Sequence, residues 1–213
     1  MDVLILGGHG KVALLLAPLL VARGDTVDSV IRNPEQADAV RASGANPIVA
    51  DIESLSTDAL ADLIHGHHAV VWSAGAGGGD PQRTYAVDKD AAIRSIDAAE
   101  HAGVRRYVMV SYFGSDLNHG VEAGSGFFPY AEAKAAADTY LRASDLSWTV
   151  VSPSTLTLEA PTGRIDAAAS TSGSVSRADV AGVIAAVLAN PTTAGRTIRF
   201  NSGETEIAAA VAR

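Results

Sequence analysis

Cysteine is absent from this sequence of 213 residues. Disulfide bonds, thiolate metal ligands and a cysteine nucleophile are therefore excluded, because each requires a thiol sulfur. Long hydrophobic runs are also lacking, since the longest, residues 12–22, is too short to span a bilayer. The first predicted strand begins at residue 2 or 3, which leaves no room for a cleavable signal. We therefore expect a cytoplasmic protein with no membrane partner.

Basic residues are few, with 16 Lys and Arg against 24 Asp and Glu and a net charge of -8. They form no stripe of the kind that a nucleic acid backbone requires, so no nucleic acid partner is expected. His65, His67 and His68 flank Gly66 at the end of a predicted helix, where histidine interacts favourably with the helix dipole. We therefore expect no metal site. A small-molecule substrate is the expected partner, and the sequence leaves monomer and homodimer open.

The chain is long and apolar enough, at 47% hydrophobic residues, to bury one core. We predict a single domain over residues 1–213, to which residues 154–175 and 191–213 contribute a small substrate-side subdomain. Pro18 lies inside the first predicted helix and predicts a local bend there. The predicted strands are residues 3–6, 26–31, 47–50, 69–73, 106–111 and 148–152, and the predicted helices are about 11–23, 34–44, 57–64, 82–101 and a segment from about 130.

Strands that alternate with helices in this way form a parallel sheet with right-handed crossovers, covered by helices on both faces. The predicted fold class is therefore α/β, a doubly wound parallel sheet (Rossmann fold) with a small C-terminal substrate-binding extension.

A glycine-rich turn follows the first predicted strand. Gly7, Gly8, His9 and Gly10 connect this strand to a helix that begins with Lys11 and Val12. Glycines let the backbone turn tightly beneath a phosphate, and the helix N-terminus offers unpaired N–H groups to the anion. Lys11 adds a positive charge, and His9 lies within reach of a phosphate. The order of strand, turn and helix predicts a dinucleotide pyrophosphate site.

A second glycine cluster, Ala74-Gly75-Ala76-Gly77, follows the buried strand 69–73. A loop without large side chains lets its backbone approach a ligand closely, although a flexible surface loop has the same composition. Arg32 ends the second predicted strand, where a protein specific for NAD usually carries an acidic residue for the ribose 2′-hydroxyl. An arginine suits a 2′-phosphate instead, so we predict that NADP(H) is preferred and that NAD(H) is possible.

Several further segments match a known family over essentially the whole length of the chain. They are the glycine turn, Val30-Ile31-Arg32, Ala50-Asp51-Ile52, Ala74-Gly75, residues 98–111, residues 130–134 and residues 176–181. With them the chain resembles the atypical short-chain dehydrogenase/reductases, close to the NAD(P)H-binding, NmrA-like and biliverdin/flavin reductase-like branch. The resemblance implies that Asp51 contacts the adenine of the cofactor and that Ile52 packs on it.

Three residues are the predicted catalytic set. Tyr130 and Lys134 are four positions apart and so share one helix face, which predicts that the ammonium lies beside the phenol, lowers its pKa and also reaches the cofactor ribose. Ser111 ends the fifth predicted strand. The resemblance implies that Tyr130 donates a proton to a carbonyl oxygen that Ser111 also binds, while the nicotinamide delivers hydride.

The strand end at Ser152-Pro153-Ser154 departs from the family pattern, which often has Arg-Pro-Gly. Pro153, Ser154 and the backbone that follows are expected against the nicotinamide. Residues 113–129 and 154–175 are expected to recognise the substrate, and the short C-terminal region argues against a nucleotide sugar. We therefore expect an NADP(H)-dependent oxidoreductase for a small carbonyl, quinone or flavin-like substrate. A non-catalytic dinucleotide sensor and an epimerase or isomerase using bound cofactor are the alternatives.

Overall fold

The computed structural model describes residues 1–212 and contains a nine-stranded sheet. Its strand order is β11-β8-β10-β6-β5-β4-β1-β2-β3. Strands β3 through β10 of this order are parallel, and β8 and β11 extend the sheet in antiparallel fashion. The strands are β1 (Asp2–Leu6), β2 (Thr26–Ile31), β3 (Asn46–Val49), β4 (Ala69–Trp72), β5 (Arg106–Val110), β6 (Ser147–Pro153), β8 (Arg164–Asp166), β10 (Arg196–Ser202) and β11 (Thr205–Glu206), with β7 (Thr155–Thr157) and β9 (Ser174–Ser176) pairing separately.

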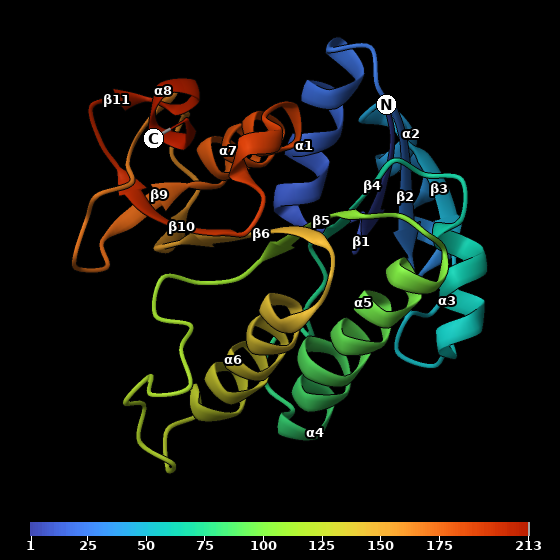
Figure 1. Ribbon diagram of the computed structural model, residues 1–213, viewed down its shortest axis with the longest axis horizontal. Helices are drawn as coiled ribbons and strands as arrows, with labels where there is room; N and C mark the ends of the chain where they lie inside the picture. Colours follow the sequence, from blue (N-terminus) through green and yellow to red (C-terminus); the bar gives the residue numbers. More distant parts are fainter. Residues whose placement is uncertain (213) are drawn as a thin grey trace.

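Helices cover both faces of this sheet (Figure 1), which confirms the predicted doubly wound α/β fold. One face carries α1, α2 and α7, and the other carries α3, α5 and α6. The helices are α1 (Lys11–Ala22), α2 (Ala37–Ala42), α3 (Thr57–Ile64), α4 (Pro81–Thr84), α5 (Ala92–His101), α6 (Phe128–Ala143), α7 (Arg177–Ala189) and α8 (Ile207–Val211), with short 3-10 turns at Pro34–Gln36 and Pro191–Thr193.

Strand β1 shows why both faces are covered. Its successive side chains point to opposite sides, and all of them from Val3 to Leu6 are buried. Val3 and Ile5 pack in the core beneath α1 and α7, whereas Leu4 and Leu6 pack in the core with α3 and α5. A strand that is apolar on both sides is typical of a parallel sheet between two helix layers.

The strand order reverses at β1, which pairs with β2 on one side and with β4 on the other. The connections that leave the carboxyl ends of β1 and β4 therefore run to opposite faces of the sheet and leave a crevice between them. In open α/β sheets, ligands bind in this crevice. Both predicted glycine turns follow these two strands, so the topology brings them together.

The predicted helix over residues 82–101 is continuous but has three parts. It begins as α4, widens into a π-helix at Tyr85–Ala91, and continues as α5. The Asp80 side chain caps its start by accepting hydrogen bonds from two N–H groups of the first turn. Short π-helical segments are frequent at functional sites. The π-helix at Tyr85–Ala91 carries Asp88, whose side chain is buried in the protein interior.

Helix α1 continues through Pro18 to Ala22, and Gly24, with a φ of +90°, ends it as predicted. The α-helix predicted over residues 34–44 is shorter in the structure, because its first residues form a 3-10 turn and α2 begins only at Ala37.

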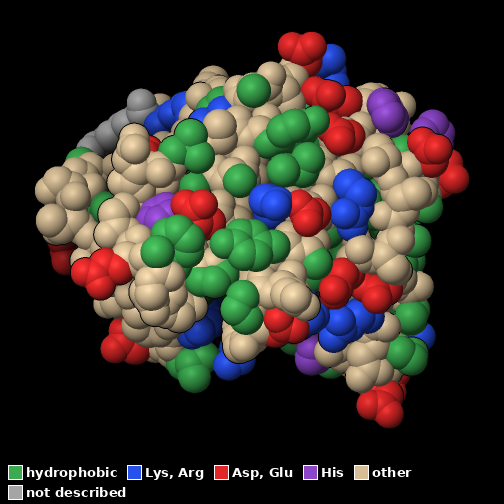
Figure 2. Space-filling view, turned by 90° about the horizontal axis from the view of Figure 1, so that it is seen from below, with side chains coloured by type: hydrophobic (Ala, Val, Ile, Leu, Met, Phe, Trp, Pro, Cys, Tyr) green, Lys and Arg blue, Asp and Glu red, His purple; other side chains and the backbone are tan. Residues whose placement is uncertain are grey.

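None of the helices within residues 1–212 is long and apolar enough to cross a membrane. On the face seen from below, acidic and basic side chains are interspersed (Figure 2).

Candidate functional site

The glycine turn after β1 fits into a narrow space between neighbouring strands. Gly7 has a φ of +90°, in the left-handed region that favours glycine. A Cβ atom at this position would lie 2.5 Å from the Cα atom of Ala74, just after β4. The N–H of Gly8 donates to the carbonyl of Val30 in β2 at 2.8 Å. Residue 7 must therefore be glycine both for its conformation and for the approach of the second loop.

The N-terminus of α1 opens onto this turn. Gly10 is the N-cap residue, and no side chain caps the helix. The first N–H groups of a helix have no partner within it, and they carry its positive dipole end. Lys11, the first helical residue, has an exposed side chain. The turn and the helix start thus form a cradle that suits a pyrophosphate.

A cavity of about 430 Å³ lies beside the turn, at the carboxyl ends of β1 to β4. Most of the residues predicted to contact the cofactor line it: Gly7, His9, Gly10, Arg32, Asp51, Ile52, Ala74 and Gly75. The other predicted residues do not line it: Gly8, Lys11, Val12, Ala76, Gly77, Pro153 and Ser154. Two charged lining residues, Glu53 and Arg83, were missed in the sequence because only the folded loops bring them to Arg32.

Glu53 lies between two arginines at the rim of this cavity. Its Oε2 atom is 3.6 Å from Nη1 of Arg32 and 3.3 Å from Nε of Arg83. The Arg32 side chain is 56% exposed, whereas the Arg83 side chain is 33% exposed. Arg32 thus extends toward solvent at the end of β2, where a 2′-phosphate is expected. The carboxylate of Glu53 lies beside its guanidinium at the same place.

Asp88 fastens the second glycine loop to the protein interior. Its Oδ2 atom accepts a hydrogen bond from the N–H of Ala76 at 2.9 Å. A Cβ atom at Gly75 would lie 3.1 Å from the other oxygen of this carboxylate, so Gly75 lets the loop approach it. Burial raises the pKa of Asp88, and the positive charge of Lys134 opposes that rise. Asp88 therefore connects the loop after β4 with the helix that carries Tyr130.

Lys134 is directed at the sheet. Its Nζ atom donates to the carbonyl of Val110 at 2.8 Å and lies 3.4 Å from the sulfur of Met109, both in β5. The residue is only 1% exposed. Burial lowers the pKa of Lys134, while the carboxylates of Asp138 and Asp88 raise it. Tyr130 and Lys134 do share one face of α6, but the ammonium points into the interior.

The expectation that Lys134 lowers the pKa of Tyr130 is not met. Burial raises the pKa of this phenol above its ordinary value, and the negative charges of Asp88 and Asp138 raise it further. The physical reason is that the lysine donates its protons to Val110, while two carboxylates lie near the ring. In this arrangement Tyr130 keeps its proton at neutral pH.

Ser111 points to Asp138, a residue that the sequence analysis missed. Both Ser111 and Ser115 donate to Oδ2 of Asp138 at 2.5 Å, and Asp138 is completely buried. The other carboxylate oxygen of Asp138 has no hydrogen-bond partner within residues 1–212. Its spacing was a signal, because Asp138 follows Lys134 by the same four residues that separate Lys134 from Tyr130. The role of Ser111 as a donor to substrate stays a prediction.

A second cavity, of about 420 Å³, adjoins Tyr130. The Tyr130 ring also packs against Phe127 and Tyr112, with centroids 5.3 and 5.6 Å away. The cavity lies between the second glycine loop and the start of α6, at the same edge of the sheet as the glycine turn. The residues that line it are Gly78, Gly79, Asp80, Pro81, Thr84, Gly126, Phe127, Pro129 and Tyr130.

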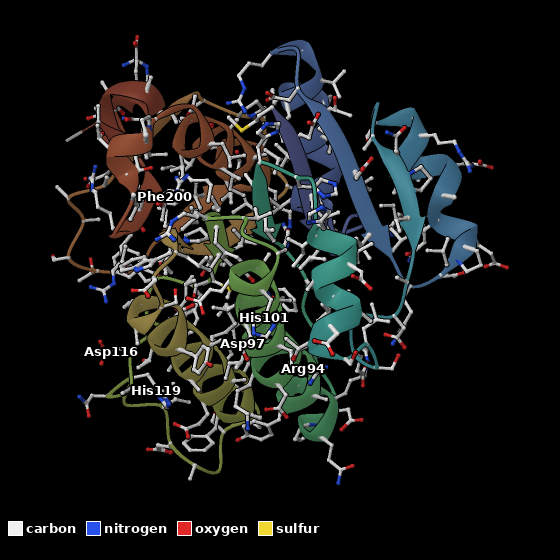
Figure 3. All side chains as sticks on the ribbon, turned by 45° about the vertical axis from the view of Figure 1, so that its right-hand side comes forward. Arg94, Asp97, His101, Asp116, His119 and Phe200 are labelled. Carbon is white, nitrogen blue, oxygen red and sulfur yellow. The ribbon has the colours of Figure 1, made fainter. Side chains whose placement is uncertain are left out.

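The long connection between β5 and α6 is anchored to its helix by a histidine. Nε2 of His119 lies 2.9 Å from Oε1 of Glu132 on α6, and Figure 3 shows His119 and Asp116 on this connection. Pro153 lies beneath the connection, because its carbonyl accepts the N–H of Phe113 at 2.8 Å.

The predicted residue Ser154 is buried directly after β6, and its N–H donates to the carbonyl of Phe200 in β10 at 3.1 Å. Its hydroxyl oxygen has no hydrogen-bond partner in the described part of the chain. Ser154 therefore offers a hydroxyl without a protein partner at this end of β6.

Two of the three clustered histidines have local partners. His67 contacts a carboxylate oxygen of Asp28 at 3.1 Å, and His68 accepts the N–H of Asp2 at 2.9 Å. Within residues 1–212, no group of three or more His, Asp or Glu is placed to hold a metal ion.

This arrangement defines a dinucleotide-binding protein: a glycine turn leads into an open helix N-terminus, beside a cavity where the strand order reverses. Comparisons with known proteins agree. The family described as NAD(P)H-binding matches residues 7–191. The chain belongs to this family, which confirms the resemblance seen in the sequence.

Similar proteins match over nearly their full length. The Bacillus subtilis "uncharacterized sugar epimerase YhfK" is 33% identical over 214 residues, which cover 99% of each chain. A solved Bacillus halodurans structure, described as an NAD-dependent epimerase/dehydratase, is 34% identical with a TM-score of 0.91 and covers 100% of this chain and 99% of its own. The oxidoreductase YlbE of Lactococcus lactis is 27% identical with a TM-score of 0.88, covering 100% and 95%.

The close approach of Gly7 to Ala74 can be tested by comparison with another glycine of the same conformation. Gly24 also has a φ of +90°, but a Cβ atom there meets no atom within 4 Å. We expect Gly24→Ala to lower the free energy of unfolding by about 1 kcal/mol, from backbone strain alone. Gly7→Ala adds an overlap with backbone and should cost more and abolish NAD(P)H binding. Urea denaturation and calorimetric titration measure both effects, and equal losses in the two variants would contradict the argument.

Asp138→Ala removes the shared acceptor of two buried hydroxyls, so we expect it to lower the free energy of unfolding by about 3 kcal/mol. Asp138→Asn keeps an acceptor oxygen and should lose clearly less. Urea denaturation of both variants checks this order. An alanine variant as stable as the asparagine variant would show that the hydrogen bonds of Ser111 and Ser115 do not matter.

Proposed function

We propose that the protein is an NADP(H)-dependent reductase of the atypical short-chain dehydrogenase/reductase class, acting on a small carbonyl, quinone or flavin-like substrate. The observation that carries the proposal is the position of Tyr130. Its ring lines the 420 Å³ cavity at the sheet edge that also holds the glycine turn. A protonated phenol beside a small cavity suits the transfer of a proton to a substrate oxygen.

The cofactor fits the cavities of this edge in a defined direction. The turn from Gly7 to Gly10, with Lys11 and Val12, holds the pyrophosphate, and Arg32 receives the 2′-phosphate. Asp51 and Ile52 contact the adenine. The loop Ala74-Gly75-Ala76-Gly77 contacts the adenosine half, since Ala74 and Gly75 line the same cavity as Asp51 and Ile52. Pro153 and Ser154, across the edge, contact the nicotinamide side. When bound, the reduced cofactor supplies the hydride.

The protein side chains supply the proton and the orientation. Tyr130 donates its proton to the substrate oxygen. Burial and two nearby carboxylates raise the pKa of this phenol, so Tyr130 carries the proton before the substrate reacts. Ser111 binds the same oxygen by exchanging its hydrogen bond to Asp138 for one to the substrate, while Ser115 continues to donate to that carboxylate. Lys134, beneath Tyr130, fixes α6 against β5.

An epimerase is the second candidate, and the name of the Bacillus subtilis relative favours it. Such an enzyme takes a hydride from its substrate and returns it to the other face, so the cofactor shows no net oxidation. The cavity of about 420 Å³ beside Tyr130 favours a smaller substrate than a nucleotide sugar. A non-catalytic sensor of the dinucleotide would use the same cofactor site without Tyr130.

Tyr130→Phe tests the proposed proton donor. The variant keeps the ring that packs on Tyr112 and Phe127 and removes only the hydroxyl. We expect NADPH oxidation with quinone, flavin and small aldehyde substrates to fall at least about 100-fold, with unchanged NADPH affinity. Tyr140→Phe is the matched control, since Tyr140 lies on the same helix and donates to Asp97 away from the cavity. Unchanged turnover in Tyr130→Phe would favour the sensor, and epimerised product without cofactor oxidation would favour the epimerase.

Calorimetric titration with NADPH and NADH tests the cofactor preference. We expect tighter binding of NADPH, and in Arg32→Ala a loss of about tenfold in NADPH affinity with little change for NADH. Arg41→Ala serves as the control, because Arg41 is exposed on α2 and its side chain pairs with Asp38 alone among the described residues. Binding of neither nucleotide by the wild-type protein would refute the oxidoreductase function.

A further inference from the structure

The carboxylate of Glu53 lies beside Arg32, the residue that distinguishes NADP(H) from NAD(H) in the proposed function. It bridges Arg32 and Arg83, and all three residues line the same cavity. Arg32 is the expected contact of a 2′-phosphate. An anion at Arg32 would therefore meet Glu53 at close range.

Hydrogen bonds to its backbone hold Glu53 at the cavity rim. Arg94, on α5 (Figure 3), donates to the carbonyl of Glu53 at 2.8 Å and to the carbonyl of Leu55 at 3.2 Å. The N–H of Glu53 donates to Oδ1 of Asp51 at 3.1 Å. The backbone after β3 is thus fixed on both sides of the residue, and the carboxylate cannot leave the rim by movement of the loop alone.

Arg83 is fixed as well, from the opposite side of the cavity. Its guanidinium donates to the carbonyl of Ala76 in the second glycine loop, and α4, which carries it, is capped by Asp80. Glu53 consequently lies between one guanidinium that is anchored to the second glycine loop and one that is more exposed. Arg32 is the more exposed of the two and is the one free to turn toward a ligand.

The charges around the cavity balance. Arg32 and Arg83 contribute two positive charges, and Asp51 and Glu53 contribute two negative charges. A 2′-phosphate brings up to two further negative charges. It gains the attraction of Arg32 but is repelled by Glu53. A ribose 2′-hydroxyl carries no charge and can donate to a carboxylate.

We propose that Glu53 is a specificity-determining residue: by holding Arg32 and Arg83 at the cavity rim, its carboxylate weakens the binding of a 2′-phosphate and so narrows the preference for NADP(H) over NAD(H). This inference rests on the proposed function, in which Arg32 receives the 2′-phosphate. The other carboxylate of the cavity, Asp51, is not assigned this role in specificity. Its Oδ1 atom already accepts the N–H of Glu53, and no ion pair joins it to either arginine in the described residues.

Glu53→Gln tests the proposal, since it removes the charge and keeps the shape. We expect NADPH affinity to rise about fivefold and NADH affinity to change less than twofold, as measured by calorimetric titration at low salt. The gain should shrink at high salt, because the ions screen the repulsion. The same substitution is also made in the Arg32→Ala variant. There, Glu53→Gln should raise NADPH affinity by a smaller factor than it does in the wild-type protein.

Glu35→Gln is the matched control. Glu35 is exposed, lies three residues after Arg32 and does not line the cavity, so this variant changes the net charge equally. An equal rise in Glu35→Gln would assign the effect to net charge and overturn the proposal. Lower NADPH affinity in Glu53→Gln, with an unchanged urea midpoint, would show that Glu53 positions the arginines for the phosphate and would also overturn it.

Failure of the inference and failure of the proposed function are distinguishable in this experiment. If the wild-type protein binds both nucleotides and Glu53→Gln keeps the same preference, only the assignment of Glu53 falls. If the wild-type protein binds neither nucleotide, the proposed function falls and this inference falls with it.

Discussion

A side chain at residue 7 would collide with the backbone of Ala74, so the connections that leave β1 and β4 can touch only through glycine. This contact lies at the point where the strand order reverses. It sets the distance between the helix N-terminus that suits a pyrophosphate and the loop that continues toward the second cavity. The position of the glycine turn beside the first cavity follows from it.

The interior behind Tyr130 contains three ionisable groups that are almost completely buried: Asp88, Lys134 and Asp138. Burial raises the pKa of Asp88 and lowers that of Lys134, and the opposite charges of these groups oppose both shifts. Lys134 donates to Val110 of β5, whereas the negative charges of Asp88 and Asp138 raise the pKa of Tyr130. A helix face with tyrosine and lysine four residues apart therefore yields a phenol with a raised pKa.

The sequence was sufficient to predict the doubly wound α/β fold in outline and the glycine turn, because both depend on local signals. Buried strands such as 69–72 are continuous apolar runs, and Gly7 follows the first of them directly. Glu53, Arg83 and Asp138 were missed for a different reason. Their partners are distant in sequence: Arg83 lies 30 positions after Glu53, and Asp138 lies 27 positions after Ser111. The orientation of Lys134 depends likewise on the sheet beneath it.

Ala76 joins the two halves of the site through its own peptide groups. Its N–H donates to Asp88, which lies in the interior beside Lys134, and its carbonyl accepts the guanidinium of Arg83, which pairs with Glu53 at the cavity rim. Asp88 and Arg83 therefore hold the second glycine loop from two sides through Ala76. The rim of the first cavity and the interior behind Tyr130 are thus connected by hydrogen bonds to the peptide groups of one residue.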